Sequence, residues 1–437
     1  MKILLRIALL GAAITAAIWG VAEVLARSYL QRAISEGWPV PSGRLEAIRD
    51  VFPRKTATPS ARRLEIEVSQ IGIEMLPRAD RGKNTPPPAG QKAWKAIEGD
   101  TKNYVRDRLA MAMRIPAPPS PPVVDYLRAN ALQIQRIEDH LISNPPPQWA
   151  VDLGKGFEAP VPNLLGHISL ARLLVTSALH HDSENNADAA WRDLHAASRL
   201  PEGLVQRPEL ISQIIAQVEV TMITGAMRQL AGAPPQWASM WPEEDLLARM
   251  ERAETADAWL FYAPFDTPPN ADLFRAFSGN DQRSTFGGRV LSLIMSPYLR
   301  ASAANTAMAH RQLLREYARL PVCSQVIPRK SPAQLIPEWN AFGRVALPSE
   351  AIGSSYQRAH QLLAQLDGTS LVIAARSFRQ RNGMWPSAAP QIRSRCSQPM
   401  WIYARTDSTS VLMATTTPLV TVGAPGALNL PQRYIDH

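Results

Sequence analysis

Hydrophobic residues recur along most of the chain with the spacing of an α-helix. One apolar stripe on a single helical face consists of Leu164, Ile168, Ala171, Leu174, Val175 and Ala178. Comparable patterns predict helices over about 91–113, 121–142, 163–181, 186–199, 206–230, 242–261, 300–319 and 349–381. Because a helix with one apolar face gains little stability alone, we expect a mainly α fold with these helices packed as an antiparallel helical array.

The segment after residue 58 has an ambiguous pattern. Leu64, Ile66 and Val68 alternate as in a strand, but Leu64 and Val68 also suit one face of a helix. Thr58 followed by Pro59 is typical of a helix N-cap with proline at the first helical position. We therefore predict a helix here.

The helix predicted over 349–381 has a clear end. Asn382 and Gly383 readily adopt the left-handed backbone that closes a helix, and Pro386 prevents its continuation. The densest basic cluster of the chain lies just before this end. We expect its members to lie on a solvated helix face, and they are Arg376, Arg379 and Arg381.

Near the carboxyl end the period changes to that of a strand. Residues 401–405 and 411–415 alternate in polarity, and the polar segment 406–409 between them suits a turn. This pattern predicts a small C-terminal β-hairpin. We expect the glycine- and proline-containing stretch near the end, residues 423–428, to be extended or loose.

The amino end predicts a transmembrane helix. Lys2 and Arg6 precede an apolar run from Ile7 to Ala22, and Glu23 is followed by three more apolar residues. About twenty such residues cross a bilayer, and the basic end stays in the cytoplasm. We expect an uncleaved signal-anchor in the inner (cytoplasmic) membrane, single-pass, with the remainder in the periplasm. A signal peptide cleaved after Ala26 is the main alternative.

These patterns divide the chain into three parts. Residues 1–36 form a membrane anchor and stalk helix, residues 37–382 an extracytoplasmic helical domain, and residues 383–437 a small β-hairpin and tail. The two cysteines, Cys323 and Cys396, both fall in the exported part, where a disulfide is possible. Their spacing in sequence does not decide whether they are bridged.

Composition agrees with a folded protein that has no nucleic-acid partner. Of 437 residues, 46% are hydrophobic and 19% are charged, as in ordered domains. The formal net charge of +9 is dispersed, without a basic stripe interleaved with aromatic residues. The 38 prolines predict many helix ends and stiff connections.

Three stretches resemble a group of bacterial membrane-anchored, exported helical proteins of unknown function. They are Arg381-Asn382-Gly383-Met384-Trp385-Pro386, Pro162-Asn163-Leu164-Leu165 and Arg207-Pro208-Glu209-Leu210-Ile211-Ser212-Gln213. The first stretch, with the hairpin after it, also resembles the helix-to-sheet junction of pseudopilins. The resemblance implies an architecture and no catalytic residues. Unlike a pseudopilin, the chain lacks a short basic leader with a Gly-Phe processing site.

Common catalytic motifs are missing from the sequence. It has neither a Gly-x-Ser-x-Gly elbow nor a phosphate-binding glycine loop. The segment 180–184 holds two histidines and two carboxylates, but adjacent histidines point in different directions, so we expect a polar loop, no bound metal and no cofactor. We expect the charged residues Glu138, Asp139 and His140 to lie on a wet helix face.

Other polar residues lie within otherwise apolar stripes. Glu209, Gln213 and Gln217 would either line a polar pocket between helices or, for Glu209, simply pair with a helix amino end. The sequence Pro-Pro-Gln-Trp-Ala occurs at 146–150 and again at 234–238. We interpret both copies as helix junctions over which the tryptophan packs.

We therefore expect a membrane-tethered helical protein that acts as an interaction or assembly component of the bacterial cell envelope, with an envelope protein partner. We favour this role over that of an enzyme. One alternative is an exported hydrolase with a dispersed active site. A deep pocket holding two or more of four side chains would favour it, and these are His167, His195, Glu209 and His310. Another alternative is an accessory of a pilus-like secretion system.

Overall fold

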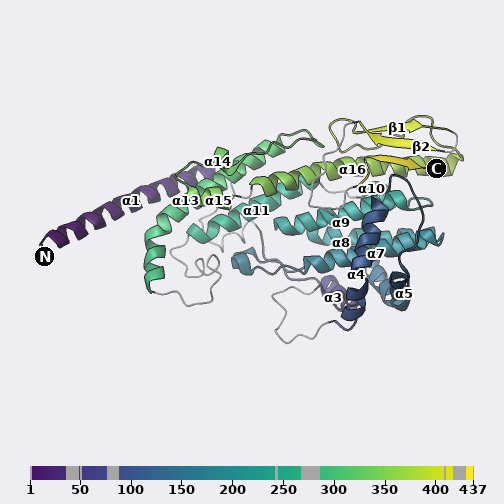
Figure 1. Cartoon of the computed structure of the whole chain (residues 1–437), viewed down its shortest axis with the longest axis horizontal. Coiled ribbons are helices and arrows are strands. Elements are labelled where there is room, and N and C mark those ends of the chain that lie inside the picture. The colour runs from purple at the N-terminus through teal and green to yellow at the C-terminus, as the bar shows by residue number, and fades with distance from the viewer. Residues whose placement is uncertain are drawn as a thin grey trace.

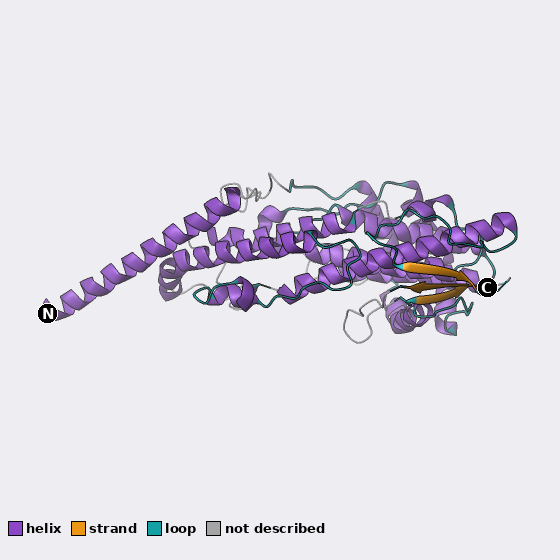
Figure 2. Cartoon of the chain, turned by 90° about the horizontal axis from the view of Figure 1, so that it is seen from above, coloured by secondary structure: helices purple, strands orange, loops and turns teal. Residues whose placement is uncertain are grey.

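The computed structural model describes residues 2–35, 49, 52–75, 88–241, 245–266, 286–347, 349–407, 410–416 and 430–436. The molecule is elongated (Figures 1 and 2). One helix, α1 (Lys2–Ser35), projects from one end, and the three-stranded sheet lies at the other end. The prediction of a mainly α protein with an N-terminal apolar helix and a small C-terminal β element is confirmed.

The other elements follow in chain order. The first half of the body contains α3 (Pro59–Gln70), α4 (Gln91–Leu109), α5 (Pro121–Ala129), α6 (Ala131–Ser143), the 3-10 helix η3 (Leu153–Glu158), α7 (Leu164–Ser183), α8 (Ala187–Val205) and α9 (Leu210–Gln229). The second half contains α10 (Gln236–Met240), α11 (Leu246–Asp266), α13 (Phe286–Ala318), α14 (Pro332–Leu335), α15 (Ala341–Ala346), α16 (Ser349–Asn382), β1 (Trp401–Arg405), β2 (Val411–Thr415) and β3 (Arg433–Asp436).

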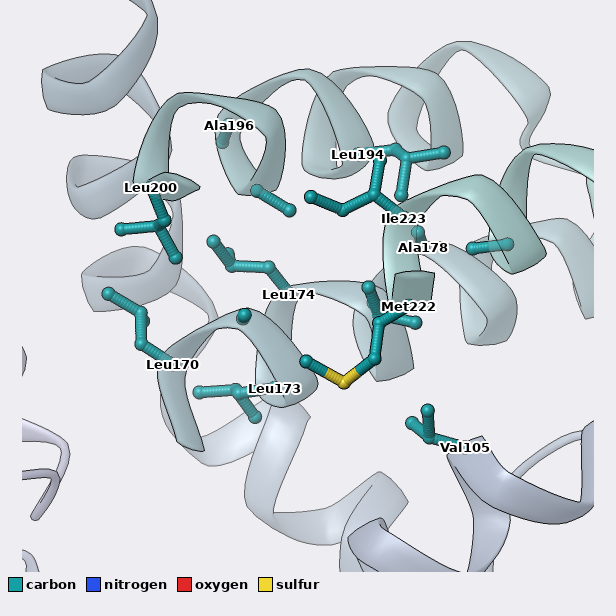
Figure 3. Packing of buried hydrophobic residues seen from close by; sticks show 14 of the residues in the cluster. Val105, Leu170, Leu173, Leu174, Ala178, Leu194, Ala196, Leu200, Met222 and Ile223 are labelled. Atoms are coloured by element: carbon teal, nitrogen blue, oxygen red, sulfur yellow. The ribbon is translucent and has the colours of Figure 1, made fainter. Parts of the chain in front are cut away.

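The main core lies where α7, α8 and α9 pack together (Figure 3). Leu170 of α7 points towards Leu200 of α8, and Leu174 lies between these two helices. Met222 and Ile223 of α9 close the cluster. Four residues of the apolar stripe predicted for α7 are buried, Ala171, Leu174, Val175 and Ala178, whereas Leu164 and Ile168 are half-buried. Close packing of aliphatic side chains between neighbouring helices is the main source of stability in such an array.

Among the residues that the structure describes, two helices are long and apolar enough to cross a membrane, and their burial differs. In α1, only 6% of the apolar window in the segment Leu10–Tyr29 is buried inside the structure. In Leu210–Gln229, which forms α9, the buried share of the window is 72%. Helix α9 is therefore a core helix of the bundle. Helix α1 exposes large apolar side chains such as Ile14, Ile18 and Val21.

Local sequence signals explain several helix boundaries. The Thr58 hydroxyl accepts a hydrogen bond from the Ala61 N–H, so α3 is a capped helix as predicted. Gly383 has φ 71° and its N–H donates to Arg379 O, which closes α16 as predicted. The helix predicted over 121–142 is instead divided into α5 and α6 at Asn130, whose side chain donates to the Tyr126 carbonyl.

The C-terminal sheet has a strand that the sequence pattern did not predict. Strands β1 and β2 form the predicted antiparallel hairpin, and β3 pairs antiparallel with β2, with Met413 opposite Tyr434. The segment 423–428, which the sequence predicts to be extended or loose, lies outside the described residues. The sheet packs on α16 through Met413 and Tyr434, against Leu371 and Val372.

The expectation of a solvated face for the basic cluster of α16 is wrong for Arg376. Its guanidinium is buried and donates to Asp436 Oδ2 at 2.5 Å and to Tyr434 Oη at 2.9 Å. It also donates to three carbonyl oxygens at the end of α9, those of Met227, Arg228 and Leu230. Because α16 is covered by α9 and by the sheet at this height, a cation is buried where helical spacing alone predicts a wet face.

Candidate functional site

A pocket of about 360 Å³ lies beside α8 and is lined by residues from both halves of the helical body. Helix α8 contributes His195 and Arg199, α10 contributes Trp237, and α11 contributes Arg249. Trp241, which follows α10, completes the aromatic part of the wall. The pocket therefore combines two indole rings, one imidazole and two guanidinium groups.

The two Pro-Pro-Gln-Trp-Ala segments lie at this part of α8. The first copy contributes Pro146 and Gln148 to the pocket, and its Trp149 packs inward and donates from its indole N–H to Glu65. In the second copy, Trp237 lines the pocket itself. Both tryptophans pack over helix junctions, as the sequence pattern indicates, and the second one also meets a cavity.

The aromatic wall is held in place by neighbouring rings. The Trp237 ring stacks on the His195 imidazole, with centroids 4.7 Å apart and planes at 14°. Its other neighbour, Trp191, meets it edge-on at 6.2 Å and donates its indole N–H to Ala231 O. Interlocked rings of this kind lose little conformational entropy when a ligand binds.

The charges around the pocket are uneven. Burial, followed by the nearby Arg199 guanidinium, lowers the pKa of His195, so that its imidazole is neutral at pH 7. Arg199 forms an ion pair with Glu202, which also lines the pocket and compensates its charge. Arg249 is almost fully buried at the wall. The pocket wall thus carries two guanidinium groups and one carboxylate, those of Arg199, Arg249 and Glu202.

The structure brings one of the four candidate hydrolase residues, His195, into this pocket. His167 is instead buried in the core, where its ring packs edge-on against Trp149 at 4.2 Å. Its Nδ1 lies 3.6 Å from Glu219 Oε1, and burial raises the pKa of Glu219. No sequence signal singled out Glu219, because a carboxylate within an apolar stripe has no local motif.

Glu209 is part of a buried structural ion pair. Arg207 donates to both of its carboxylate oxygens, at 3.1 and 2.5 Å, and also to the carbonyl oxygens of Ala150 and Pro160. The Gln213 amide donates to Leu204 O at 2.9 Å. These contacts hold the link between α8 and α9 together. Glu209 and Gln213 therefore pair with neighbouring groups of the chain and do not line a polar pocket.

The fourth residue, His310 of α13, lies in a separate buried cluster. Its Nε2 is 3.1 Å from Glu254 Oε2 of α11. Gln217 of α9 donates to Met250 Sδ of α11 at 2.8 Å. Burial, with Glu254 close by, raises the pKa of Asp257 to about 7. The four residues His167, His195, Glu209 and His310 therefore lie in separate environments and do not converge.

The remaining polar candidates serve packing. Asp182 of the segment 180–184 is bound by Arg114 at 3.0 Å and by the Ala231 N–H, so it is tied into the core. In the described part of the chain, no three His, Cys, Asp or Glu side chains gather as metal ligands.

The expected wet face over 138–140 is wrong for two of its three residues. Asp139 is exposed, but Glu138 and His140 are buried. Glu138 shares a hydrogen bond with Asp193 of α8, and burial raises the pKa of both carboxyls. Helix α6 packs against both α3 and α8, so two of its faces are covered.

A larger cleft of about 1300 Å³ lies between α16 and the irregular segment 386–395. Its wall carries Arg381, Arg393 and Arg395. Asp245, the residue before α11, also lines it. Asp367 compensates the Arg395 charge at 3.5 Å. The cleft therefore has two exposed arginines beside an extended, proline-containing segment.

A disulfide fixes one edge of this cleft. Cys323 and Cys396 are bridged, with Cα atoms 5.2 Å apart. The bond ties the segment after α13 to the segment before β1. Val322, next to Cys323, lines the cleft, and its N–H donates to the Ser397 hydroxyl at 3.0 Å.

Helix α1 is fixed to the body at its second half. Glu23 forms an ion pair with Arg300 of α13 at 2.8 Å, and Ala26 is buried. Further along, the Tyr29 ring stacks with Trp339 at 6.1 Å. The contact region thus starts at the residue that interrupts the apolar run. The half before it projects from the body (Figure 2).

The sequence pattern did not identify the cationic members of the pocket, Arg199 and Arg249. The signals available in the sequence were His195 and the repeated Pro-Pro-Gln-Trp-Ala segment, both copies of which border the pocket. No protein-family model, curated protein or solved structure matches this chain.

Proposed function

We propose that the protein is a membrane-tethered, extracytoplasmic helical protein that acts as an interaction or assembly component of the bacterial cell envelope. The observation that carries the proposal is the projecting apolar half of α1, whose exposed side chains have no cover from the body. A lipid bilayer is the environment in which about twenty such residues are stable.

The second half of α1 favours an anchor that stays attached. Cleavage after Ala26 would remove Glu23 and leave Arg300, whose side chain is 19% exposed, without this carboxylate. It would also uncover the surface of α13 on which Ala26 packs. Removing one partner of a largely buried ion pair is destabilising. The helical body is therefore more stable when α1 keeps its full length.

The cleft beside α16 is the surface we assign to the partner. Arg381 and Arg393 are exposed on its two walls, and the segment 386–395 between them lies outside the helices and strands. Charge complementarity favours an acidic, extended segment of another envelope protein. A tethered protein with such a cleft can hold a partner close to the membrane.

The first experiment tests topology. Full-length protein carrying alkaline phosphatase at its carboxyl end is expressed in bacterial cells, and the membranes are separated with and without detergent. We expect an active phosphatase, release only by detergent, and an intact mass that includes residues 1–26. An inactive phosphatase fusion, or release of the protein by salt alone, would refute the tether.

The second experiment tests the partner surface. A photo-crosslinking amino acid replaces Ala389 at the cleft, and Lys102 on the exposed side of α4 serves as the matched control position. We expect a discrete crosslinked protein from Ala389 that disappears with Arg381→Glu plus Arg393→Glu. Arg136→Glu, on a different surface, should leave it unchanged. Equal crosslinking at both positions would contradict the assignment.

A further inference from the structure

We propose that the base of the helical body, where α1 joins it, is seated in the headgroup layer of the bilayer that α1 spans. This inference rests on the proposed tether and adds a second membrane contact to it. The base is defined by three aromatic residues, Tyr29 of α1, Tyr298 of α13 and Trp339, which lies just before α15. The partner of this surface is a phospholipid interface.

The membrane segment and the part of α1 that contacts the body belong to one helix. Helix α1 is continuous over Lys2–Ser35, so the depth of its apolar run in the bilayer sets the depth of the body. Glu23, directly after that run, forms its ion pair with Arg300 of α13, and Ala26 is buried about one turn later. The body is therefore held against α1 from the level at which the apolar run ends.

The rise of an α-helix places the base at the headgroup layer. About twenty residues cross the hydrocarbon, and a stretch of that length that ends at Ala22 begins at Ile3. Tyr29 lies six residues beyond Glu23, which is about 9 Å along the helix axis at roughly 1.5 Å per residue. The headgroup layer is roughly 5–8 Å thick on each side of the bilayer. Tyr29 therefore lies at its outer edge, and groups nearer to Glu23 lie within it.

The two other aromatic residues reach the same level from neighbouring elements. The Trp339 ring stacks on Tyr29 with centroids 6.1 Å apart, and the Trp339 carbonyl accepts a hydrogen bond from the Tyr298 hydroxyl at 3.2 Å. Tyr298 lies two residues before Arg300, the ion-pair partner of Glu23. Helix α13 packs against both α1 and α15, beside the end of α1 that joins the body (Figure 1). The three rings therefore lie close to the levels of Glu23 and Tyr29.

The exposure and chemistry of these residues suit a membrane interface. Trp339 is 39% exposed, and Tyr29 and Tyr298 are half-buried. Tryptophan and tyrosine are enriched where a bilayer meets water, because each combines an apolar ring with a polar end. Val24 and Leu25 of α1 expose apolar side chains at the same level. The exposed apolar surface thus continues from the membrane segment to the base, and this continuity identifies lipid as its cover.

The test measures the depth of individual tryptophans. Full-length protein labelled with 5-fluorotryptophan is placed, at one copy per disc, in phosphatidylcholine nanodiscs whose lipid carries a nitroxide on either the headgroup or an acyl chain. A nitroxide broadens the fluorine signals of residues near it. Trp19, inside the apolar run, reports the tether, and Trp339 reports the base. Trp401 of β1, at the opposite end of the molecule (Figure 1), is the matched control, and each signal is assigned with a Trp→Phe variant.

We expect the headgroup nitroxide to remove most of the Trp339 signal and the acyl-chain nitroxide to remove most of the Trp19 signal. Trp401 should keep its signal with both lipids. A second label, 3-fluorotyrosine, provides the test if the Trp339→Phe variant does not fold. Tyr298 should then lose most of its signal to the headgroup nitroxide, whereas Tyr403 of β1 should keep its signal.

The seated base and the tether fail in different ways. If Trp339 or Tyr298 keeps its signal while Trp19 loses its own, the seated base is overturned and the tether stands. A Trp339 signal that responds to the number of copies per disc and not to the nitroxide assigns the base to a contact between two copies, which also overturns the proposal. If Trp19 keeps its signal with both lipids, the tether is refuted and this inference with it.

Discussion

Arg376 provides the sharpest test of how the helical body and the sheet are joined. Its guanidinium donates to five acceptors: the Asp436 carboxylate, the Tyr434 hydroxyl and the carbonyl oxygens of Met227, Arg228 and Leu230. One side chain thus connects α16, the end of α9 and β3. Arg376→Met keeps much of the side-chain volume and removes all of these donors.

The expected cost is large because the acceptors stay buried. Removing one partner of a buried ion pair costs about 3–5 kcal/mol, and Asp436 would remain as an uncompensated carboxylate. That is a large part of the roughly 5–15 kcal/mol by which a folded domain is stable. We therefore expect Arg376→Met to lower the free energy of unfolding by about 3 kcal/mol or more.

The assay is urea unfolding of the full chain in detergent, followed by circular dichroism. Arg379→Met is the matched control, because Arg379 lies one turn away and stacks over the Trp385 ring at 4.6 Å, a contact worth about 0.5–1 kcal/mol. In a background of Asp436→Asn, the cost of Arg376→Met should fall by about 0.5–3 kcal/mol. The reasoning is refuted if both arginine variants lose the same stability, or if the Asp436 background changes nothing.

Three further predictions each concern the stability contributed by one site. Burial lowers the pKa of His360 from 6.5 to about 4, so on acidification the unfolded chain binds this proton before the folded chain does. The free energy of unfolding should therefore fall as the pH drops from 6.5 to 4, by at most about 3 kcal/mol. In His360→Asn this part of the curve of stability against pH should be flatter. Reducing the Cys323–Cys396 disulfide, which spans a sequence separation of 73, should lower the free energy of unfolding by about 4 kcal/mol through chain entropy. The measurement compares unfolding curves with and without reductant, and an unchanged unfolding midpoint would contradict the prediction. Gly166→Ala should destabilise by about 1–3 kcal/mol, because the new Cβ would lie 2.0 Å from Glu74 O, and a melting temperature equal to that of the unaltered protein would show that α7 can move away.

Periodicity in the sequence was sufficient for most helices, because an amphipathic stripe repeats over several turns. Helices α7 and α9 lie close to their predicted ranges, and the end of α16 follows from Asn382 and Gly383. The split between α5 and α6 was missed, since Asn130 carries no proline or glycine signal. Strand β3 was missed as well, because its four residues gain their order from pairing with β2.

Burial of charged residues was the least predictable feature. Arg376 and Glu138 lie on helices whose sequences suggest a polar face, but those helices are covered on more than one side. The candidate pocket shows the same limit. His195 and the repeated tryptophan segment were visible in the sequence, whereas the placement of Arg249 beside them depends on how α11 packs near α8.

The sequence by itself determined the elements: an apolar amino-terminal helix, a series of amphipathic helices with proline-limited ends, and a hairpin near the carboxyl end. These are local properties, set by side-chain spacing and backbone preference over a few residues. The tertiary structure decided which charges are buried, that Cys323 meets Cys396, and that two distant helix junctions enclose one pocket. Such contacts join residues far apart in the chain, so they form only when whole helices pack together.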